Sequence, residues 1–268
     1  MKNINIIGCG IMGSQLACLF GIMGYNVNIW SRSNINLDKL GKQRKLLSRF
    51  LKIYDKNGSF NLVNKIEDLK NFITIECLAE DRNLKIKYFL NLSKVISKEI
   101  FTNTSSIKTS DIDERLSLLH FFNPISMKII EYNKKNKLSD EATSLIEDLK
   151  KENFQMIEVS NFTGYAFNKL LFLEISNLFF LIEKENLNKK YLETILKHLN
   201  KDLDILNTID IIGVDVCLKI LENLNKEYNT YIPRLISFCF SQKILGKKNK
   251  TSVKTIFNSE KYPNNLWP

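Results

Sequence analysis

Short apolar runs and longer segments with helical spacing alternate along the first 160 residues. The apolar runs predict strands at residues 3–7, 27–30, 72–77, 100–102, 116–120, 128–131 and 155–159. Helical spacing predicts helices at residues 14–23, 37–70, 82–96 and 139–151. Strands that alternate with helices in this way predict an α/β fold with a mostly parallel, doubly wound sheet.

After Gly164 the pattern becomes helical throughout. Residues 165–187 form a long apolar segment, and further helical segments follow to about residue 240. A helix this apolar is not a lone surface helix, so we expect it to be a central helix, an oligomer contact, or both. We place the domain boundary near Ser160 and Asn161, between a dinucleotide-binding domain (1–160) and an all-α C-terminal domain (161–268) for substrate binding and dimerisation.

A glycine-rich turn joins the first predicted strand to the first predicted helix. Its sequence, Gly8-Cys9-Gly10-Ile11-Met12-Gly13, has the form GxGxxG. Between a strand and a helix, this motif lets the backbone approach a pyrophosphate at a helix N-terminus. We therefore predict a Rossmann-type fold with a cofactor site that includes Gly8, Gly10, Ile11, Met12 and Gly13.

The end of the second predicted strand bears on cofactor choice. An acidic residue about 20 positions after the glycines usually binds the ribose 2′-hydroxyl of NAD. Here that place is Ser31-Arg32-Ser33, and no carboxylate occurs before Asp38. Arg32 would attract a 2′-phosphate that a carboxylate would repel. Ser31 and Arg32 therefore favour NADP(H), with NAD(H) left open.

The predicted strands end near Gly8, Ser31, Glu80, Ser105 and His120. Ligands of doubly wound sheets bind at the carboxyl ends of the strands, so we expect these positions to share one crevice. The chain has 2 histidines. His198 lies in a helical segment without a partner motif, and we expect a surface residue there. His120 is followed by Glu131, which makes a histidine–carboxylate pair for proton transfer.

Composition narrows the functional classes. The formal charge of +10 and a pI of about 9.2 suit an acidic partner, but the basic residues are spread along the chain, so nucleic acid is not expected. No uncharged apolar run of 18 residues and no secretory signal are seen, so we expect no membrane span and a cytoplasmic protein. The 5 scattered cysteines suit a reducing compartment and predict neither disulfides nor a metal site.

Six motifs together resemble the 3-hydroxyacyl-CoA dehydrogenase family, including the bacterial 3-hydroxybutyryl-CoA dehydrogenases. They are the glycine turn, Glu76 to Glu80, Asn103-Thr104-Ser105-Ser106, His120-Phe121-Phe122-Asn123-Pro124, Met127-Lys128-Ile129-Ile130-Glu131, and the segment from Gly164 to Leu171. The resemblance spans nearly the whole chain and is strongest over residues 1–172.

The resemblance implies that His120 is the general acid/base at the substrate's 3-oxygen and that Glu131 orients and polarises its ring. It implies that Ser105 and Asn168 hydrogen-bond the same oxygen. The resemblance implies that Glu80 and Lys85 line the cofactor and substrate cleft and that Asn103 belongs to the cofactor site. It implies that Asn123, also placed at the cofactor site, supports the His120 loop. The apolar aromatics Phe121, Phe122 and Phe167 would suit a small acyl chain.

The chain also departs from the family pattern. One residue fewer separates Pro124 from Met127, so His120 and Glu131 are eleven positions apart and their contact needs to be checked. The C-terminal motifs have drifted more than the catalytic half. A change of acyl group or of carrier would account for this difference between the two halves of the chain.

Three functions follow from these observations. The first is an NAD(P)-dependent dehydrogenase that interconverts 3-hydroxyacyl and 3-oxoacyl thioesters of a short acyl-CoA. The second is the same chemistry on a substrate bound to an acyl carrier protein, which the basic charge would suit. The third is a catalytically inactive paralogue that binds a dinucleotide. The family resemblance also implies a homodimer.

Overall fold

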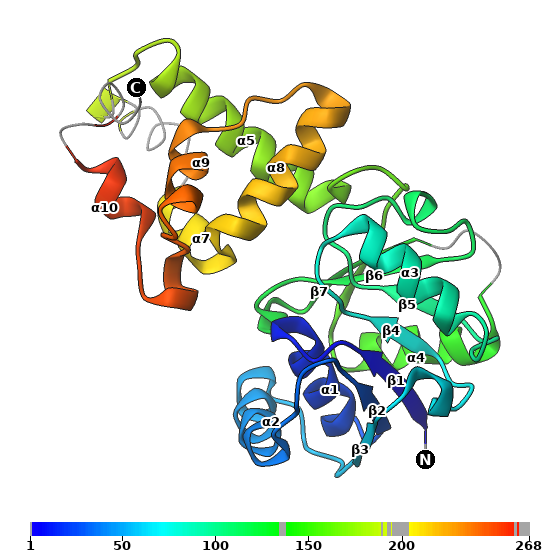
Figure 1. Cartoon of the computed structure of the whole chain (residues 1–268). Helices are drawn as coiled ribbons and strands as arrows, with labels where there is room; N and C mark the ends of the chain where they lie inside the picture. Colours follow the sequence, from blue (N-terminus) through cyan, green and yellow to red (C-terminus); the bar gives the residue numbers. More distant parts are fainter. Residues whose placement is uncertain are drawn as a thin grey trace. The chain divides into compact units, whose positions relative to one another are not determined.

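The computed structural model describes residues 2–133, 138–188, 190–191, 194, 204–259 and 262. The chain divides into two compact units, Met1–Phe162 and Thr163–Pro268. The first carries the sheet, and the second is helical in the part that the structure describes (Figure 1). His198, expected at the surface, lies outside the described residues.

The first unit contains an eight-stranded sheet in the order β3-β2-β1-β4-β5-β6-β7-β8 (Figure 1). Neighbouring strands are parallel except for the antiparallel pair β6 and β7. The strands are β1 (Asn3–Ile7), β2 (Asn26–Trp30), β3 (Phe60–Val63), β4 (Thr74–Glu76), β5 (Ile100–Thr102), β6 (Ser117–Phe121), β7 (Ile129–Asn133) and β8 (Gln155–Glu158). The predicted mostly parallel, doubly wound sheet is confirmed.

Helices cover both faces of this sheet because successive strand residues point to opposite sides. Ile4 and Ile6 of β1 pack in one apolar cluster with Leu16 and other residues of α1. Ile7 belongs to a second cluster with Phe89 of α3. The helices of the unit are α1 (Ile11–Ile22), α2 (Leu37–Leu51), α3 (Arg82–Leu92) and α4 (Asp140–Lys151), with short 3-10 turns η1 (Ile66–Asp68), η2 (Thr109–Asp111) and η3 (Ile125–Met127).

The predicted helix over residues 37–70 is wrong beyond α2. The helix ends at Leu51, and the chain then forms β3 along the outer edge of β2. Lys52 adopts a left-handed conformation (φ 55°), which stops the helix. Because both ends of β3 are only partly buried and its centre is exposed, its sequence lacks the apolar alternation that identifies a strand.

Three asparagines form a ladder across the first three strands. Nδ2 of Asn28 donates to Oδ1 of Asn5 at 3.0 Å, and Nδ2 of Asn61 donates to Oδ1 of Asn28 at 3.0 Å. These residues lie opposite one another in the strand register. A register shift would leave buried amides unpaired, so the ladder favours this alignment of β1, β2 and β3.

The second unit is built around α5 (Tyr165–Glu183). The other elements are α7 (Ile205–Ile212), α8 (Val214–Tyr228), α9 (Arg234–Ser241), η4 (Gly246–Asn249) and α10 (Val253–Phe257). Phe172, Ile175 and Phe179 of α5 are buried against Leu221 and Leu235. By length and composition α5 could cross a membrane, although 44% of its most apolar window is buried among its neighbours. Within this unit it is the core helix, as the sequence predicted.

A buried carboxylate joins the end of α5 to the start of α9. Glu183 accepts hydrogen bonds from the backbone N–H groups of Arg234 (2.7 Å) and Leu235 (2.9 Å). It also accepts from the hydroxyls of Tyr231 (2.5 Å) and Tyr262 (3.0 Å). Backbone N–H groups at a helix N-terminus stabilise a negative charge, so this acid fixes the packing of the helical unit.

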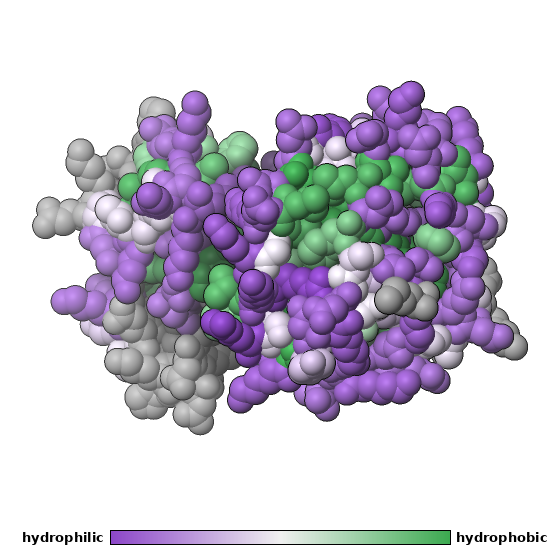
Figure 2. Space-filling model, turned by 90° about the horizontal axis from the view of Figure 1, so that it is seen from below, coloured by the Kyte–Doolittle hydropathy of each residue, from purple (hydrophilic) through white to green (hydrophobic). Residues whose placement is uncertain are grey.

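The surface is mainly hydrophilic, as Figure 2 shows for one face, where apolar residues gather in one broad area. Two exposed apolar groups bear on function. On α2, Leu46 is 55% exposed and Phe50 is 74% exposed. On α5, Leu170 is 73% exposed and Leu181 is 40% exposed.

Candidate active site

The glycine turn lies between β1 and α1, where the strand order changes direction. A Cβ added at Gly13 would lie 1.8 Å from the carbonyl oxygen of Gly8, so close strand–helix packing requires glycine there. A Cβ at Gly10 would meet no protein atom within 4 Å. The protein's own packing therefore does not require Gly10, whereas a pyrophosphate bound at the start of α1 would require it.

A pocket of about 420 Å³ opens beside this turn. It is lined by residues of the turn, α1, the end of β2 and α2: Cys9, Gly10, Ile11, Ser14, Gln15, Ser31, Ser33, Asn34, Ile35, Asn36, Lys39, Leu40 and Gln43. The lining residues described include no carboxylate, and Lys39 is the cation among them. Arg32 is exposed and is not part of this lining, so sequence reasoning chose a different cation from the one that the pocket presents.

His120 and Glu131 lie opposite each other on the antiparallel strands β6 and β7. Nδ1 of His120 is 2.9 Å from Oε2 of Glu131. Glu131 is 1% exposed and His120 6% exposed, so the pair is largely shielded from water. The 3-10 turn η3 lies in the connection between the two strands, and the contact that the sequence left in doubt is present.

The aromatic residues after His120 have separate surroundings. Phe122 packs on the His120 ring, with ring centroids 5.2 Å apart. Phe121 is 1% exposed and packs edge-on against Phe20 and Phe154 in the core. The expectation that Phe121 borders the acyl chain is therefore wrong, because alternation along β6 turns its side chain into the core.

Asn103 and Gln15 fix the two segments beside His120. Oδ1 of Asn103 accepts from the backbone N–H of Phe121 at 2.8 Å, which ties the end of β5 to β6. Nε2 of Gln15 donates to Oδ1 of Asn123 at 3.4 Å, and Oε1 of Gln15 accepts from the N–H of Ile125 at 3.3 Å. Sequence reasoning missed Gln15; its place two residues after the last glycine of the turn is a signal that could have found it.

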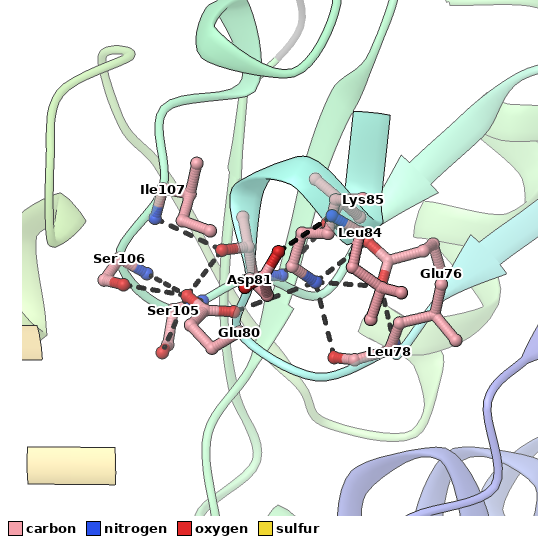
Figure 3. A network of polar contacts seen from close by, with 11 residues as sticks. Glu76, Leu78, Glu80, Asp81, Leu84, Lys85, Ser105, Ser106 and Ile107 are labelled. Carbon is pink, nitrogen blue, oxygen red and sulfur yellow. Dashed lines mark hydrogen bonds and ion pairs between the residues drawn. The ribbon is translucent and has the colours of Figure 1, made fainter. Parts of the chain in front are cut away.

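Glu80 binds the loop that carries Ser105 (Figure 3). Its Oε1 accepts from the Thr104 hydroxyl at 2.6 Å and from the N–H groups of Ser105 (3.0 Å) and Ser106 (2.8 Å). Lys85 is 1% exposed and lies between Glu76 and Glu80. Both residues were expected to line the cofactor cleft; the contacts described here join them to other parts of the protein.

The remaining predicted residues are placed as follows. Asn168 is buried near the start of α5 in the helical unit, and its role stays a prediction. Gly8 follows β1, and Met12 lies in the first turn of α1. Among the described residues, no group of three or more His, Cys, Asp or Glu side chains could hold a metal ion.

A glycine turn at the point where a sheet of order 3-2-1-4-5-6 changes direction defines a dinucleotide-binding protein of the Rossmann type. Residues 3–159 match the family model for the NAD binding domain of 3-hydroxyacyl-CoA dehydrogenase. The chain belongs to this family, as its motifs indicated, and NAD(H) is the cofactor type of the matched domain.

Individual relatives agree with this assignment. The chain is 27% identical to 3-hydroxybutyryl-CoA dehydrogenase of Clostridioides difficile, over 91% of this chain and 96% of that protein. It is similar in structure to (S)-3-hydroxybutyryl-CoA dehydrogenase PaaH1 of Ralstonia eutropha (TM-score 0.75, 25% identity, 94% of this chain and 98% of that one). M. tuberculosis FadB2 shares the fold with a TM-score of 0.80 at 20% identity, over 94% and 98% of the two chains.

Proposed function

We propose that the chain is a dehydrogenase that interconverts 3-hydroxyacyl and 3-oxoacyl thioesters of a short acyl-CoA. The observation that carries this proposal is the buried contact between His120 and Glu131. It lies at the carboxyl edge of a sheet whose first turn suits a dinucleotide. The relatives named above as 3-hydroxybutyryl-CoA dehydrogenases support a short acyl group.

In this proposal the protein supplies the proton and the position of the substrate. Gly10 and the pocket beside the glycine turn would hold the nicotinamide cofactor, which would supply the hydride chemistry at C3 of the substrate. During oxidation His120 takes the proton of the 3-hydroxyl, and during reduction it returns that proton to the 3-oxygen. Because Nδ1 faces Glu131, we assign the proton exchange to Nε2.

Glu131 holds the ring in place through Nδ1. We assign hydrogen bonds to the substrate oxygen to Ser105 and Asn168. Polar groups preset around an oxygen whose charge changes lower the barrier to reaction.

The test is turnover of acetoacetyl-CoA with NADH and NADPH. We expect measurable oxidation of cofactor by the wild-type chain and a loss of about 10²- to 10⁴-fold in kcat for His120→Ala, with cofactor affinity retained. His198→Ala is the matched control and should keep full activity. Absence of turnover on every short 3-oxoacyl thioester tried would reject the proposal and favour the inactive dinucleotide-binding paralogue.

We further propose that NADPH is used in preference to NADH. Support comes from Ser31, Ser33 and Lys39 in the lining of the pocket and from the lack of a carboxylate among the described lining residues. Lys39→Ala should lower kcat/KM for NADPH about tenfold and leave kcat/KM for NADH nearly unchanged, because only NADPH carries the 2′-phosphate. Lys42→Ala, one turn away and outside the lining, is the control. An equal effect on both cofactors would contradict a 2′-phosphate contact.

An acyl carrier protein is the alternative source of the substrate. The exposed face of α2 combines Lys42, Lys45 and Arg49 with Leu46 and Phe50, which suits an acidic partner with apolar contacts. Rates with carrier-bound and CoA-bound 3-oxobutyryl thioesters at equal concentration separate the two sources. A faster reaction with the CoA ester would remove the carrier hypothesis.

We also propose a cytoplasmic homodimer. All five cysteines are unpaired, which suits a reducing compartment. Exposed Phe167, Leu170 and Leu181 form an apolar stripe on α5 that suits a partner subunit.

A further inference from the structure

Several donors of the loop after β5 bind one oxygen atom of the Glu80 carboxylate. Besides the Thr104 hydroxyl and the N–H groups of Ser105 and Ser106, Oε1 of Glu80 accepts from the Ser106 hydroxyl at 2.8 Å. The Ser105 hydroxyl is 3.4 Å from the same oxygen. A carboxylate has about four acceptor sites on its two oxygens. These donors therefore occupy the acceptor sites of Oε1.

The other oxygen of this carboxylate faces a buried ammonium group. Nζ of Lys85 is 3.7 Å from Oε2 of Glu80 and 2.8 Å and 3.0 Å from the two oxygens of Glu76 (Figure 3). The Thr102 hydroxyl and the N–H of Leu78 also bind Glu76, at 2.7 Å and 2.5 Å. Lys85 thus links the ends of β4 and β5 to the loop that Glu80 binds.

The charges in this cluster persist at neutral pH. Burial alone would raise the pKa of Glu80, but Lys85 and the hydrogen bonds from Thr104 and Ser106 outweigh burial and lower it. Burial alone would lower the pKa of Lys85, but the carboxylates of Glu76 and Glu80 outweigh burial and raise it. The loop is therefore bound by an ionised carboxylate, whose hydrogen bonds are stronger than those of a neutral acceptor.

We propose that Glu80 is a positioning residue that acts through Ser105, and that Lys85 holds Glu80 for this purpose. The proposal rests on the function proposed above, in which Ser105 binds the substrate oxygen. Glu80 binds the backbone N–H groups of Ser105 and Ser106 and the side-chain hydroxyl of Thr104, so it restricts where the Ser105 hydroxyl lies. A displacement of about 1 Å at a reacting centre lowers rates by up to about 10²-fold.

Glu80→Gln separates positioning from cofactor binding. The amide keeps the shape but loses the charge and half of the acceptor capacity, and Lys85 stays paired with Glu76, so no buried charge loses its partner. We expect kcat to fall about 10- to 10²-fold while the Kd of NADH, measured by fluorescence, changes less than about threefold. A rise in the Kd of NADH with kcat kept would overturn the proposal and make Glu80 a cofactor ligand. Glu141→Gln, at a partly exposed ion pair with Lys98, is the matched control.

A double-mutant cycle shows whether Glu80 acts through Ser105. If it does, Glu80→Gln should lower kcat much less in a Ser105→Ala background than in the wild type, because the hydroxyl to be positioned is gone. Equal factors in both backgrounds would overturn the proposal. Should Glu80→Gln fail to fold, Ser106→Ala removes one donor and no charge; it should lower kcat by a smaller factor, and that effect should also vanish without the Ser105 hydroxyl.

Hydrogen exchange tests the anchoring without turnover. Amides of Ser105 and Ser106 should exchange at least tenfold faster in Glu80→Gln than in wild type, and unchanged rates would overturn the proposal. A wild-type chain that turns over no thioester would reject the proposed function alone, since the exchange result stands independently.

Discussion

At the scale of single residues, the proposed chemistry depends on the contact between Glu131 and His120. A carboxylate that is 1% exposed is stable only with close partners, and Nδ1 of His120 lies 2.9 Å away. Glu131→Gln keeps the volume and removes the negative charge that faces Nδ1 of His120. We expect kcat for reduction of acetoacetyl-CoA to fall about 10²-fold, with the Kd of NADH unchanged.

The matched control for this substitution lies on the next strand. Glu158→Gln changes a carboxylate on β8 that accepts a hydrogen bond from the Tyr132 hydroxyl at 3.1 Å. It should leave kcat within about twofold, because exposed pairs of this kind contribute little. If the two variants lose activity equally, the assigned role of Glu131 is wrong.

Single residues could be predicted where residue type and spacing along the sequence were sufficient. His120 was found because histidine is scarce and a carboxylate follows it. Its distance to Glu131 depends on the register of an antiparallel strand pair within a mostly parallel sheet, which spacing alone does not reveal. Lys39 was missed because it meets the pocket only after α2 folds back toward the glycine turn.

At the scale of elements, two glycines of the turn between β1 and α1 are expected to have different roles. Gly13 is required for folding, and Gly10 is expected to be required for cofactor binding. Gly13→Ala would place a methyl group 1.8 Å from the Gly8 carbonyl, and we expect a loss of about 3 kcal/mol in the free energy of unfolding. Gly10→Ala has open space, so stability should change by less than about 1 kcal/mol.

Gly10→Ala, which should barely change stability, should clearly weaken the binding of cofactor. In Gly10→Ala the new methyl group occupies space for the pyrophosphate, and the Kd of NADH should rise about tenfold or more. Urea unfolding and cofactor fluorescence measure the two effects on the same samples. A Gly10→Ala chain with normal affinity would show that the cofactor does not approach this turn.

A second element-scale prediction concerns the attachment of α4. Asp148 of α4 accepts a hydrogen bond from the buried Tyr25 hydroxyl at 2.6 Å and pairs with Lys2. Burial tends to raise the pKa of Asp148, but Lys2 and Tyr25 outweigh burial and lower it. A lowered carboxylate pKa adds stability above the unfolded-state pKa of about 3.9, and this stability is lost as the pH falls through the folded-state value.

Asp148→Asn should therefore lower the urea midpoint at pH 7 and at pH 5 by similar amounts. The difference from wild type should shrink as the pH falls below about 3.9. Glu147→Gln, which changes an exposed neighbour on the same helix, should have little effect at any pH. A difference for Asp148→Asn that stays constant down to the lowest pH would mean that the charge of Asp148 adds no stability.

Elements were predictable where both faces or one face of a segment are buried. β1 and β2 stand out as apolar runs, and α4 has apolar residues on one face with Ser139 as its N-terminal cap. β3 was missed because backbone hydrogen bonds to β2, and not buried side chains, determine it. The pattern of apolar and polar residues along a segment indicates which side chains are buried, and an edge strand buries few side chains.

At the scale of the whole molecule, the sequence predicted the sheet class and the helical second unit. It did not predict the order of the strands, since order depends on crossover connections and not on local patterns. The GxGxxG turn follows β1 at the point where the strand order changes direction, which is where sheets of this kind bind a dinucleotide. The motif was visible in the sequence, whereas the strands and helices around it could be identified only in the structure.

The proposed homodimer makes the last prediction. Leu170 on α5 is 73% exposed, although α5 is the core helix of its unit. Burying such a side chain against a second subunit stabilises a dimer, whereas a charge at its place would have to be desolvated. We expect Leu170→Glu to shift the chain from dimer to monomer in sedimentation velocity experiments at micromolar concentration.

Phe50→Glu is the matched control, because Phe50 on α2 is 74% exposed and equally apolar. If the subunits pair through α5, Phe50→Glu should sediment like the wild type. A wild-type chain that is monomeric, or a dimer that Leu170→Glu leaves intact, would contradict pairing through this stripe. A dimer lost in Phe50→Glu alone would move the interface to α2, and the carrier-protein hypothesis would then lose the free surface on which it depends.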